Sequence, residues 1–371
     1  MVQKGKTNKA KAPYIMKRLR LLLIIVCLFL SFPTMFAETI AGRWTAEKAN
    51  KWYAQYPWMA GCDYIPANAD NQIEMWSEAT YDHATIDKEL GWAEQLGFKT
   101  LRVFLSSIVY AHDSQGLKTR MDDFLSVCAS HGIKPMFVFF DDCWNAFSAY
   151  GPQPQPLTGV HNSQWVQDPS CDLRLDTAKL YPQLKRYVQD ILTTFGHDSR
   201  VLMWDLYNEP GNSHHGTTSL PLLRNVFIWA RQCQPSQPLT AGIWRETDDF
   251  KPLNDFQLSN SDIISYHDYH DSIRHEQEIK KLRALGRPLA CTEYMARTQG
   301  SFFRTIMPLL KRHRVIAINW GLVTGKTNTR FAWGDPHPDG SEPDVWFHDI
   351  LRPDGSPYLT QEVNFIKAQT K

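Results

Sequence analysis

The sequence predicts a single (β/α)8 barrel, and three observations lead to this fold class. Short apolar segments recur eight times between about residues 55 and 325, and most are apolar on both faces, which is typical of parallel strands covered by helices. Amphipathic segments lie between them, so strands and helices alternate. The 371 residues are enough for one such barrel, which takes about 250 residues. The expected strands are 59–64, 100–105, 134–140, 201–206, 238–243, 263–266, 288–291 and 315–320.

The expected helices follow these strands in order, and glycines mark where two of them end. In "LGFKTLRVF" and "HGIKPMFVFF" a Gly closes a helix just before a strand. An open doubly wound sheet is the alternative fold, but no glycine-rich phosphate loop follows the first strand. The expected helices are 81–96, 121–131, 178–195, 220–232, 272–285 and 302–311, with a C-terminal helix at 359–368.

The first 37 residues differ in kind from the rest. Residues 16–20 are basic, residues 21–30 form an apolar run, and Ala37 supplies a small residue before Glu38. This order is typical of a secretory signal peptide, and the run is shorter than the roughly 20 residues that span a bilayer. We expect translation to begin at Met16, cleavage near Ala37, and a secreted or periplasmic protein without stable membrane insertion. The expected domains are therefore 1–37, extension and signal peptide, and 38–371, the barrel.

Charge and cysteine content exclude several classes of function. Lys and Arg number 40 against 39 Asp and Glu, a net charge of +1, and without a basic stripe we expect no nucleic-acid partner. None of the six cysteines after residue 37 forms a C-x-x-C pair typical of zinc or redox sites. Export permits a disulfide between Cys143 and Cys171, but we favour buried, reduced cysteines. We expect a monomer.

One long connection interrupts the regular alternation. Residues 141–177, after the third expected strand, are rich in Pro, Gly, Asn and aromatic residues, as in "YGPQPQPLTGVHNSQW". A connection this long inside a compact domain is usually functional. It follows the carboxyl end of a strand, where barrel enzymes have their active sites, so we expect it to border the site.

Two glutamates stand where expected strands end. Glu209 and Glu293 each follow an apolar run, and the 84 residues between them equal about three strand–helix units of roughly 30 residues. Their carboxylates can therefore meet across the barrel mouth. Such a pair suits a glycosidase, in which one carboxyl group protonates the leaving oxygen and the other attacks the sugar.

Other strand-end residues would give these two carboxyl groups different environments, as opposite roles require. Arg102 favours the ionised form of a nearby carboxylate, whereas an aromatic wall such as Trp320 disfavours charge. Asn208 can donate a hydrogen bond to a sugar hydroxyl. The ordinary alternatives are structural: Glu209 as a helix-start carboxylate and His267 as a satisfied buried histidine.

"WDLYNEP" at 204–210, followed by "TEY" at 292–294, resembles clan A of the retaining (β/α)8 glycoside hydrolases, and within it the family 5 cellulase and β-mannanase group. The resemblance covers nearly all of the chain after residue 37. It implies that Glu209, paired with Asn208, is the acid/base at the end of strand four and that Glu293 is the nucleophile at the end of strand seven. It also implies that Tyr269 hydrogen-bonds the nucleophile. The implied substrate-side residues on strands two, six and eight are Arg102, His267, Tyr269 and Trp320.

The third strand end differs from the cellulase pattern. Many cellulase-type members have a His there, whereas this chain has "FFDDCW". An Asp or Asn followed by Trp resembles the mannanase side of the group. Asp141, Asp142 and Trp144 are therefore expected at the substrate, and Trp165 and Trp333 are further candidates for stacking on sugar rings.

The sequence thus predicts a retaining hydrolase of β-linked polysaccharide or oligosaccharide, with β-mannan or β-glucan as leading substrates and endo action favoured. No metal or organic cofactor is expected. The first alternative is an exo-acting β-glycosidase on another plant or microbial glycan. The second is a catalytically silent carbohydrate-binding barrel. A metal-dependent hydrolase centred on His267 and Asp268 is the third.

Overall fold

The computed structural model describes residues 1–2 and 38–371. The chain divides into two units, Met1–Ala37 and Glu38–Lys371. The expected signal peptide lies outside the described residues. Within the described part, no helix is long and apolar enough to cross a membrane.

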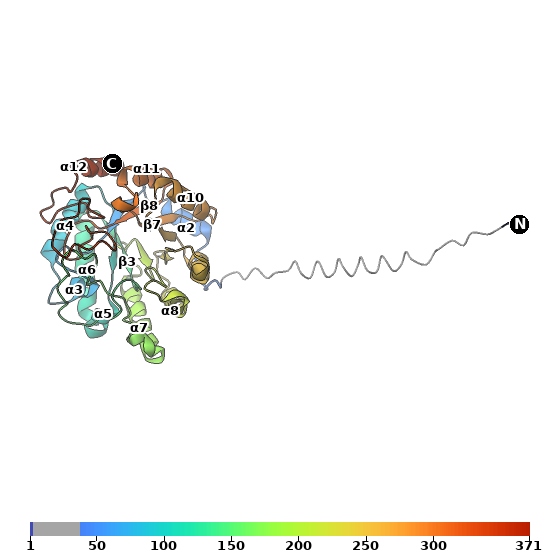
Figure 1. Ribbon diagram of the computed structural model, residues 1–371. Helices are drawn as coiled ribbons and strands as arrows, with labels where there is room; N and C mark the ends of the chain where they lie inside the picture. Colours follow the sequence, from blue (N-terminus) through green and yellow to red (C-terminus); the bar gives the residue numbers. More distant parts are fainter. Residues whose placement is uncertain (3–37) are drawn as a thin grey trace. The chain divides into compact units, whose positions relative to one another are not determined.

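Eight parallel strands form the barrel, which confirms the predicted fold class (Figure 1). The sheet runs in the order β5-β4-β3-β2-β1-β8-β7-β6. A parallel bridge between Ile243 and Tyr266 joins its two ends, so the sheet closes on itself. Each strand overlaps the segment expected from the sequence. Their bounds are β1 (Ala60–Asp63), β2 (Thr100–Phe104), β3 (Lys134–Val138), β4 (Met203–Asp205), β5 (Leu239–Thr240), β6 (Ile264–His267), β7 (Leu289–Glu293) and β8 (Ile316–Trp320).

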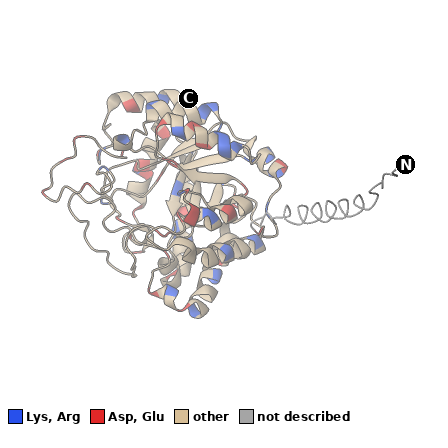
Figure 2. Ribbon diagram, turned by 45° about the vertical axis from the view of Figure 1, so that its right-hand side comes forward, with Lys and Arg blue, Asp and Glu red and all other residues tan. Residues whose placement is uncertain are grey.

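Helices surround the barrel, and the seven predicted ones lie within a few residues of their expected positions except at the start of α6. Asp82, Asp176 and Asp271 cap α4, α7 and α10 by accepting hydrogen bonds from first-turn amides. In the view of Figure 2, basic and acidic residues are interspersed along the helices. The predicted helices are α4 (His83–Gln95), α6 (Ser114–Ser130), α7 (Thr177–Phe195), α8 (Leu220–Cys233), α10 (Ser272–Arg283), α11 (Phe303–Arg312) and α12 (Thr360–Thr370). Those not predicted are α2 (Ala46–Tyr53), α3 (Gln72–Trp76), α5 (Ser107–His112) and α9 (Lys251–Asn260).

The two ends of the barrel differ in chemistry. A buried apolar cluster closes the amino end of the strands, where Trp52 of α2 packs with Met59, Met136 and Ile316. Charged and polar groups are buried at the other end, among them Arg102 and Glu293. Because apolar packing fills one end, the polar mouth is the place where this barrel can hold a ligand.

The long connection after β3 is an ordered part of the mouth. Asn145 pairs with Val166 and Asp141 with Asp168, so the segment folds back on itself as a bridged loop. The six cysteines that the structure describes are free. The Cys143–Cys171 disulfide is therefore not formed, and four of the six are buried as the favoured alternative expected.

Candidate active site

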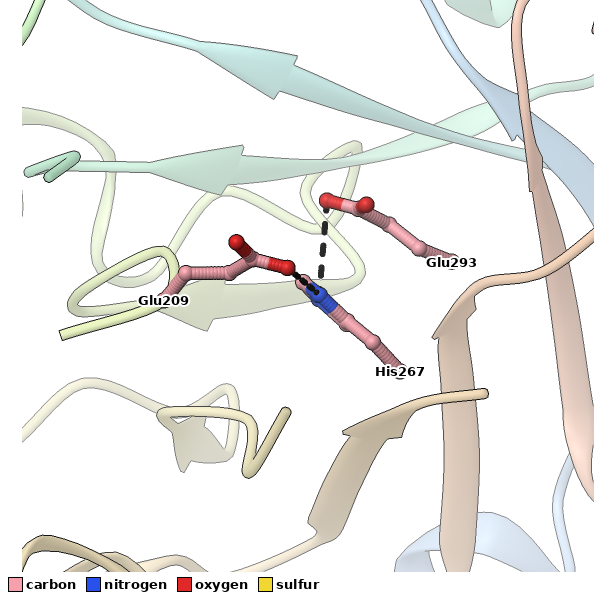
Figure 3. A group of neighbouring side chains, drawn as sticks. All are labelled: Glu209, His267 and Glu293. Carbon is pink, nitrogen blue, oxygen red and sulfur yellow. Dashed lines mark hydrogen bonds and ion pairs between the residues drawn. The ribbon is translucent and has the colours of Figure 1, made fainter. Parts of the chain in front are cut away.

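The two glutamates converge at the mouth. Glu209 follows β4, and Glu293 is the last residue of β7. One carboxylate oxygen of each and a ring nitrogen of His267 lie within 4.8 Å of one another (Figure 3). Retaining glycosidases hold their two carboxyl groups about 5–5.5 Å apart, whereas inverting ones need about 6.5–9.5 Å. The spacing is thus that of the retaining geometry.

The segment "NEPGN" turns the chain sharply at the end of β4. Glu209 adopts a left-handed backbone (φ +42°) and Gly211 follows at φ +91°. A Cβ on Gly211 would lie 2.8 Å from Leu253 Cδ1, so only glycine fits there. A non-glycine residue in this conformation costs about 1–3 kcal/mol and persists only where its surroundings impose it. The turn aims the Glu209 side chain into the mouth.

Sheet register places the partners of Glu293. Asp63 on β1 pairs with Arg102 on β2, and His267 on β6 pairs with Glu293. The fully buried Arg102 guanidinium donates hydrogen bonds to Glu293 Oε1 and Asp63 Oδ1, both at 2.9 Å, and to Asp205 Oδ2 at 3.0 Å. One guanidinium therefore serves three carboxyl groups.

Tyr269 completes the surroundings of Glu293. Its hydroxyl donates to Glu293 Oε2 at 2.7 Å, as the family resemblance implied. Burial raises the pKa of Glu293 and the charge of Glu209 adds to this, while Arg102 and the Tyr269 hydroxyl oppose it. The donors are those that an ionised, attacking carboxylate needs.

Glu209 has a different set of neighbours. Burial raises its pKa, and hydrogen bonds from Cys143 and Asn212 partly offset the rise. His267 Nδ1 lies 2.7 Å from Glu209 Oε1. Burial lowers the pKa of His267 to about 4, so its imidazole is neutral near neutral pH. Glu209 thus lacks the direct contact with a cation that Glu293 has, which favours its protonated form.

Asp141 and Asp142 lie behind the cavity wall, which corrects their expected contact with substrate. Asp141 is buried and accepts from the Asn208 amide at 2.8 Å and the Trp165 indole at 2.7 Å. Asp142 accepts from the Gly211 amide at 2.7 Å and pairs with Arg174 at 2.7 Å. Both carboxylates therefore bind groups of the loop and of the turn rather than facing the cavity. They position Asn208 and Glu209.

A cavity of about 850 Å³ fills the mouth. Of the expected residues, Glu209, Glu293, Asn208, His267 and Tyr269 line it, whereas Arg102 lies beneath it. All three tryptophans expected to stack on sugars line it too, together with Trp320 and Trp244. Its walls are mainly aromatic, amide and imidazole side chains: Trp144, Trp165, Trp244, Trp320, Trp333, Tyr269, Asn145, Asn162, Gln167, Asn212, His161, His214, His267, His270 and His348.

Sequence reasoning missed two buried histidines of this wall. His161 Nδ1 lies 2.8 Å from the carbonyl of Phe331, and His348 Nδ1 lies 2.6 Å from that of Met295. Both come from long loops, so no strand-end pattern marks them. Asp63 and Asp205 were missed as well, although a buried Asp inside an apolar strand is a signal that can be read.

Glu209, His267 and Glu293 are the one group among the described residues with metal-ligand spacing. The nearest positive charge argues against a cation there. Arg102 Nη1 already lies 2.9 Å from Glu293 Oε1, and a metal ion on that oxygen would face the guanidinium charge. Asp268, the other residue of the metal hypothesis, lines the cavity beside His270 and contacts its ring at 2.9 Å.

Solved structures identify the fold. No protein-family model matches the chain, and no curated protein matches its sequence. An exo-β-1,4-mannosidase from Opitutaceae bacterium strain TAV5 superposes with a TM-score of 0.58 at 15% identity, over 90% of this chain and 62% of that one. This barrel is built like the family 5 glycoside hydrolases.

Two further structures support this likeness. A family 5 enzyme from Streptomyces cattleya, solved with Manβ1-4GlcNAc, gives a TM-score of 0.56 at 11% identity, over 85% of this chain and 79% of that one. An endo-1,4-β-D-mannanase from Thermotoga petrophila RKU-1 gives 0.52 at 15% identity, over 84% and 99%. At these identities the likeness establishes the fold, and the chain spans less than two thirds of the Opitutaceae protein's length.

Proposed function

We propose that this protein is a retaining glycoside hydrolase of β-linked glycans. The observation that carries the proposal is the approach of Glu209 and Glu293 to within 4.8 Å, one without and one with a guanidinium partner. This spacing permits direct attack by a carboxylate on the anomeric carbon. The aromatic cavity above the pair suits a sugar ring.

The proposed reaction has two displacements. Glu209 protonates the glycosidic oxygen while Glu293 attacks the anomeric carbon, so the leaving alcohol departs and a glycosyl ester forms on Glu293. Glu209, now ionised, takes a proton from water, and the resulting hydroxide equivalent cleaves the ester with net retention. Asn208, held by Arg102 and Asp141, lines the cavity, and its second amide hydrogen can donate to a hydroxyl of the reacting sugar when that hydroxyl replaces its weak contact with Cys143 Sγ at 3.4 Å. No metal or organic cofactor enters these steps.

The substrate class is part of the proposal. β-Mannan or β-glucan leads, and two of the structures compared above carry mannose-specific names. One of these two structures is named as an exo-acting enzyme and the other as an endo-acting one. The similarity of this chain to both therefore does not distinguish exo from endo action. Export through the N-terminal segment stays part of the proposal, since the substrate would be extracellular.

Alanine variants of the two glutamates test the reaction. Glu209→Ala and Glu293→Ala should each lose at least about 100-fold in kcat on a nitrophenyl glycoside, the low end of what positioned acid–base groups contribute. Azide should restore turnover in both, giving the β-glycosyl azide with Glu209→Ala and the α-glycosyl azide with Glu293→Ala. Glu276→Ala on α10, at a partly exposed glutamate outside the cavity, is the matched control.

The azide products separate the proposal from its alternatives. Full activity in either alanine variant would contradict the assignment of the pair. Glycan binding by the wild type without any release of reducing sugar, over a panel of mannan, glucan and xylan, would instead support a silent carbohydrate-binding barrel.

A further inference from the structure

Two long connections of the mouth are joined to each other. Residues 139–176 follow β3 and residues 321–359 follow β8, and we call their junction the clasp. The amide of Asn162 donates to the carbonyl of Thr327 at 2.7 Å. The amide of His337 donates to the carbonyl of Gly159 at 3.0 Å. The clasp therefore links the β3 side of the mouth with the β8 side.

The clasp is close-packed. A Cβ on Gly159 would lie 2.1 Å from the carbonyl oxygen of His337, and Gly159 has φ +67°, so the contact requires glycine. His161, which is 4% exposed, contacts the Phe331 carbonyl from inside the clasp. Asn328 donates its side-chain amide to the Leu157 carbonyl at 3.0 Å. Buried, paired groups of this kind indicate a fixed wall.

Aromatic rings fill the mouth beneath the clasp. Trp165 is 2% exposed, and its ring packs edge-on against Phe104 at 5.0 Å and Trp320 at 5.6 Å between centroids. Behind these rings, beside Asp63 of β1, a cavity measures about 20 Å³. That volume holds about one water molecule and no sugar residue.

The hollow on the outer face of the loop adjoins the main cavity only at Asn145 and Ala146, the two residues that line both. It measures about 410 Å³ and is lined by Gln164 and Val166, whereas Trp165 and Gln167 face the main cavity. Successive residues thus point to opposite faces, as in an extended chain. The segment is a wall between the two spaces.

The side of the cavity that lies away from the clasp is next to Glu209, the proposed acid/base. In the sheet order the clasp spans β3-β2-β1-β8, while His214, Trp244 and His270 border the cavity from the loops after β4, β5 and β6. Glu209 follows β4, and an acid/base stands beside the leaving group. The leaving group therefore occupies the side away from the clasp, and the sugar that is transferred to Glu293 lies toward the clasp.

We propose that the enzyme acts at the non-reducing end of its substrate, with room for one glycone residue between Trp320 and the clasp, and releases that residue as a monosaccharide. This inference rests on the proposed function. It replaces the endo action that the sequence favoured, because an endo enzyme needs space for chain on both sides of the cleaved bond.

Product analysis tests the inference. β-1,4-Mannohexaose and β-1,4-glucohexaose, each labelled at the reducing end, should be shortened one residue at a time, with a monosaccharide as the first unlabelled product. A para-nitrophenyl β-bioside should release nitrophenol only after a lag, because its outer sugar must leave first. Internal cleavage or a disaccharide as first product overturns the inference and leaves the proposed function intact. No hydrolysis of any glycan in the panel refutes the proposed function itself.

Variants test the wall. Trp165→Ala removes the indole from the closed side, and we expect disaccharide among its first products from the labelled hexaoses. Trp229→Ala, at another buried tryptophan, on α8, is the matched control and should release monosaccharide only. If Trp165→Ala does not fold, Asn328→Gly keeps the left-handed backbone (φ +56°) and deletes one clasp bond, with the same expected change. Release of monosaccharide alone by a folded wall variant overturns the assignment of the wall.

Discussion

Cys143 makes an unusual contact with Glu209, the proposed acid/base. Its Sγ lies 3.2 Å from Glu209 Oε2, and the side-chain amide of Asn212 donates to the same oxygen. Burial raises the pKa of the Cys143 thiol well above its usual range, so the thiol is protonated near neutral pH and donates its hydrogen. With two donors on Oε2, the proton of the acid form belongs on Oε1, which faces His267.

Cys143→Ala should therefore change acid catalysis selectively. A hydrogen bond to a charged group contributes about 1.5–3 kcal/mol, and because a thiol is a weak donor we take about 1.4 kcal/mol, which equals about one pH unit or a factor of ten. The lost donor stabilised ionised Glu209, so the pKa of Glu209 rises. The basic limb of the kcat/KM profile should move up by about one unit.

The assay compares leaving groups. Dinitrophenol leaves without protonation, whereas an unactivated alcohol needs the proton from Glu209. Cys143→Ala should lower kcat/KM about tenfold on an oligosaccharide and much less on a dinitrophenyl glycoside. Cys143→Ser keeps a donor and should recover most of the loss, and Cys233→Ser on α8 is the control outside the site. Equal losses on both substrates, or a basic limb that moves down, would refute the reasoning.

Two further perturbations follow from buried groups. Tyr269→Phe deletes the hydroxyl 2.7 Å from Glu293 Oε2, so the pKa of Glu293 should rise and the acid limb of kcat/KM should move up by about one to two units; an unchanged acid limb contradicts this. Burial lowers the pKa of His161 to about 4, so its contribution to stability is complete above pH 6.5 and is lost as pH falls toward 4. Urea unfolding at pH 7 and at pH 4.5 measures how far the free energy of unfolding falls with acid. In His161→Gln this fall should be smaller than in the wild type by up to about 3 kcal/mol. An equal fall in both proteins would contradict this.

The barrel was predictable because its signals are local. Strands buried on both faces read as apolar runs, and the residues that end them, such as Glu209 and Glu293, fall at one end of a closed sheet. The short helices α3 and α5 were missed because each has only five or six residues, too few for a helical period to show. Asp142 was placed at the substrate because adjacency in sequence says nothing of which face a loop residue takes.

The clasp could not be predicted from the sequence, because it is a contact between two distant loops. Asn162 and Thr327 are 165 positions apart, and nothing local to either loop specifies its partner. Gly159, which has a left-handed backbone in the clasp, is visible in the sequence. A glycine in a Pro-rich loop is common in ordinary turns, however, so it does not predict the contact with the other loop. Whether a barrel mouth is a cleft or a pocket is thus decided by contacts between loops, which the spacing of strands does not encode.

The charge balance around Arg102 limits how many of its carboxyl partners are ionised together. Asp63, Asp205 and Glu293 share a single guanidinium, so three ionised carboxylates would leave an uncompensated buried charge. Burial raises the pKa of Asp63 well above its usual range, and its Oδ2 is buried without a hydrogen-bond partner among the described residues. A proton on Asp63 lowers the excess from two negative charges to one, and the guanidinium charge then serves Asp205 and Glu293. In the proposed mechanism, the ionised form of Glu293 depends on a proton held on β1, two strands away in the sheet order.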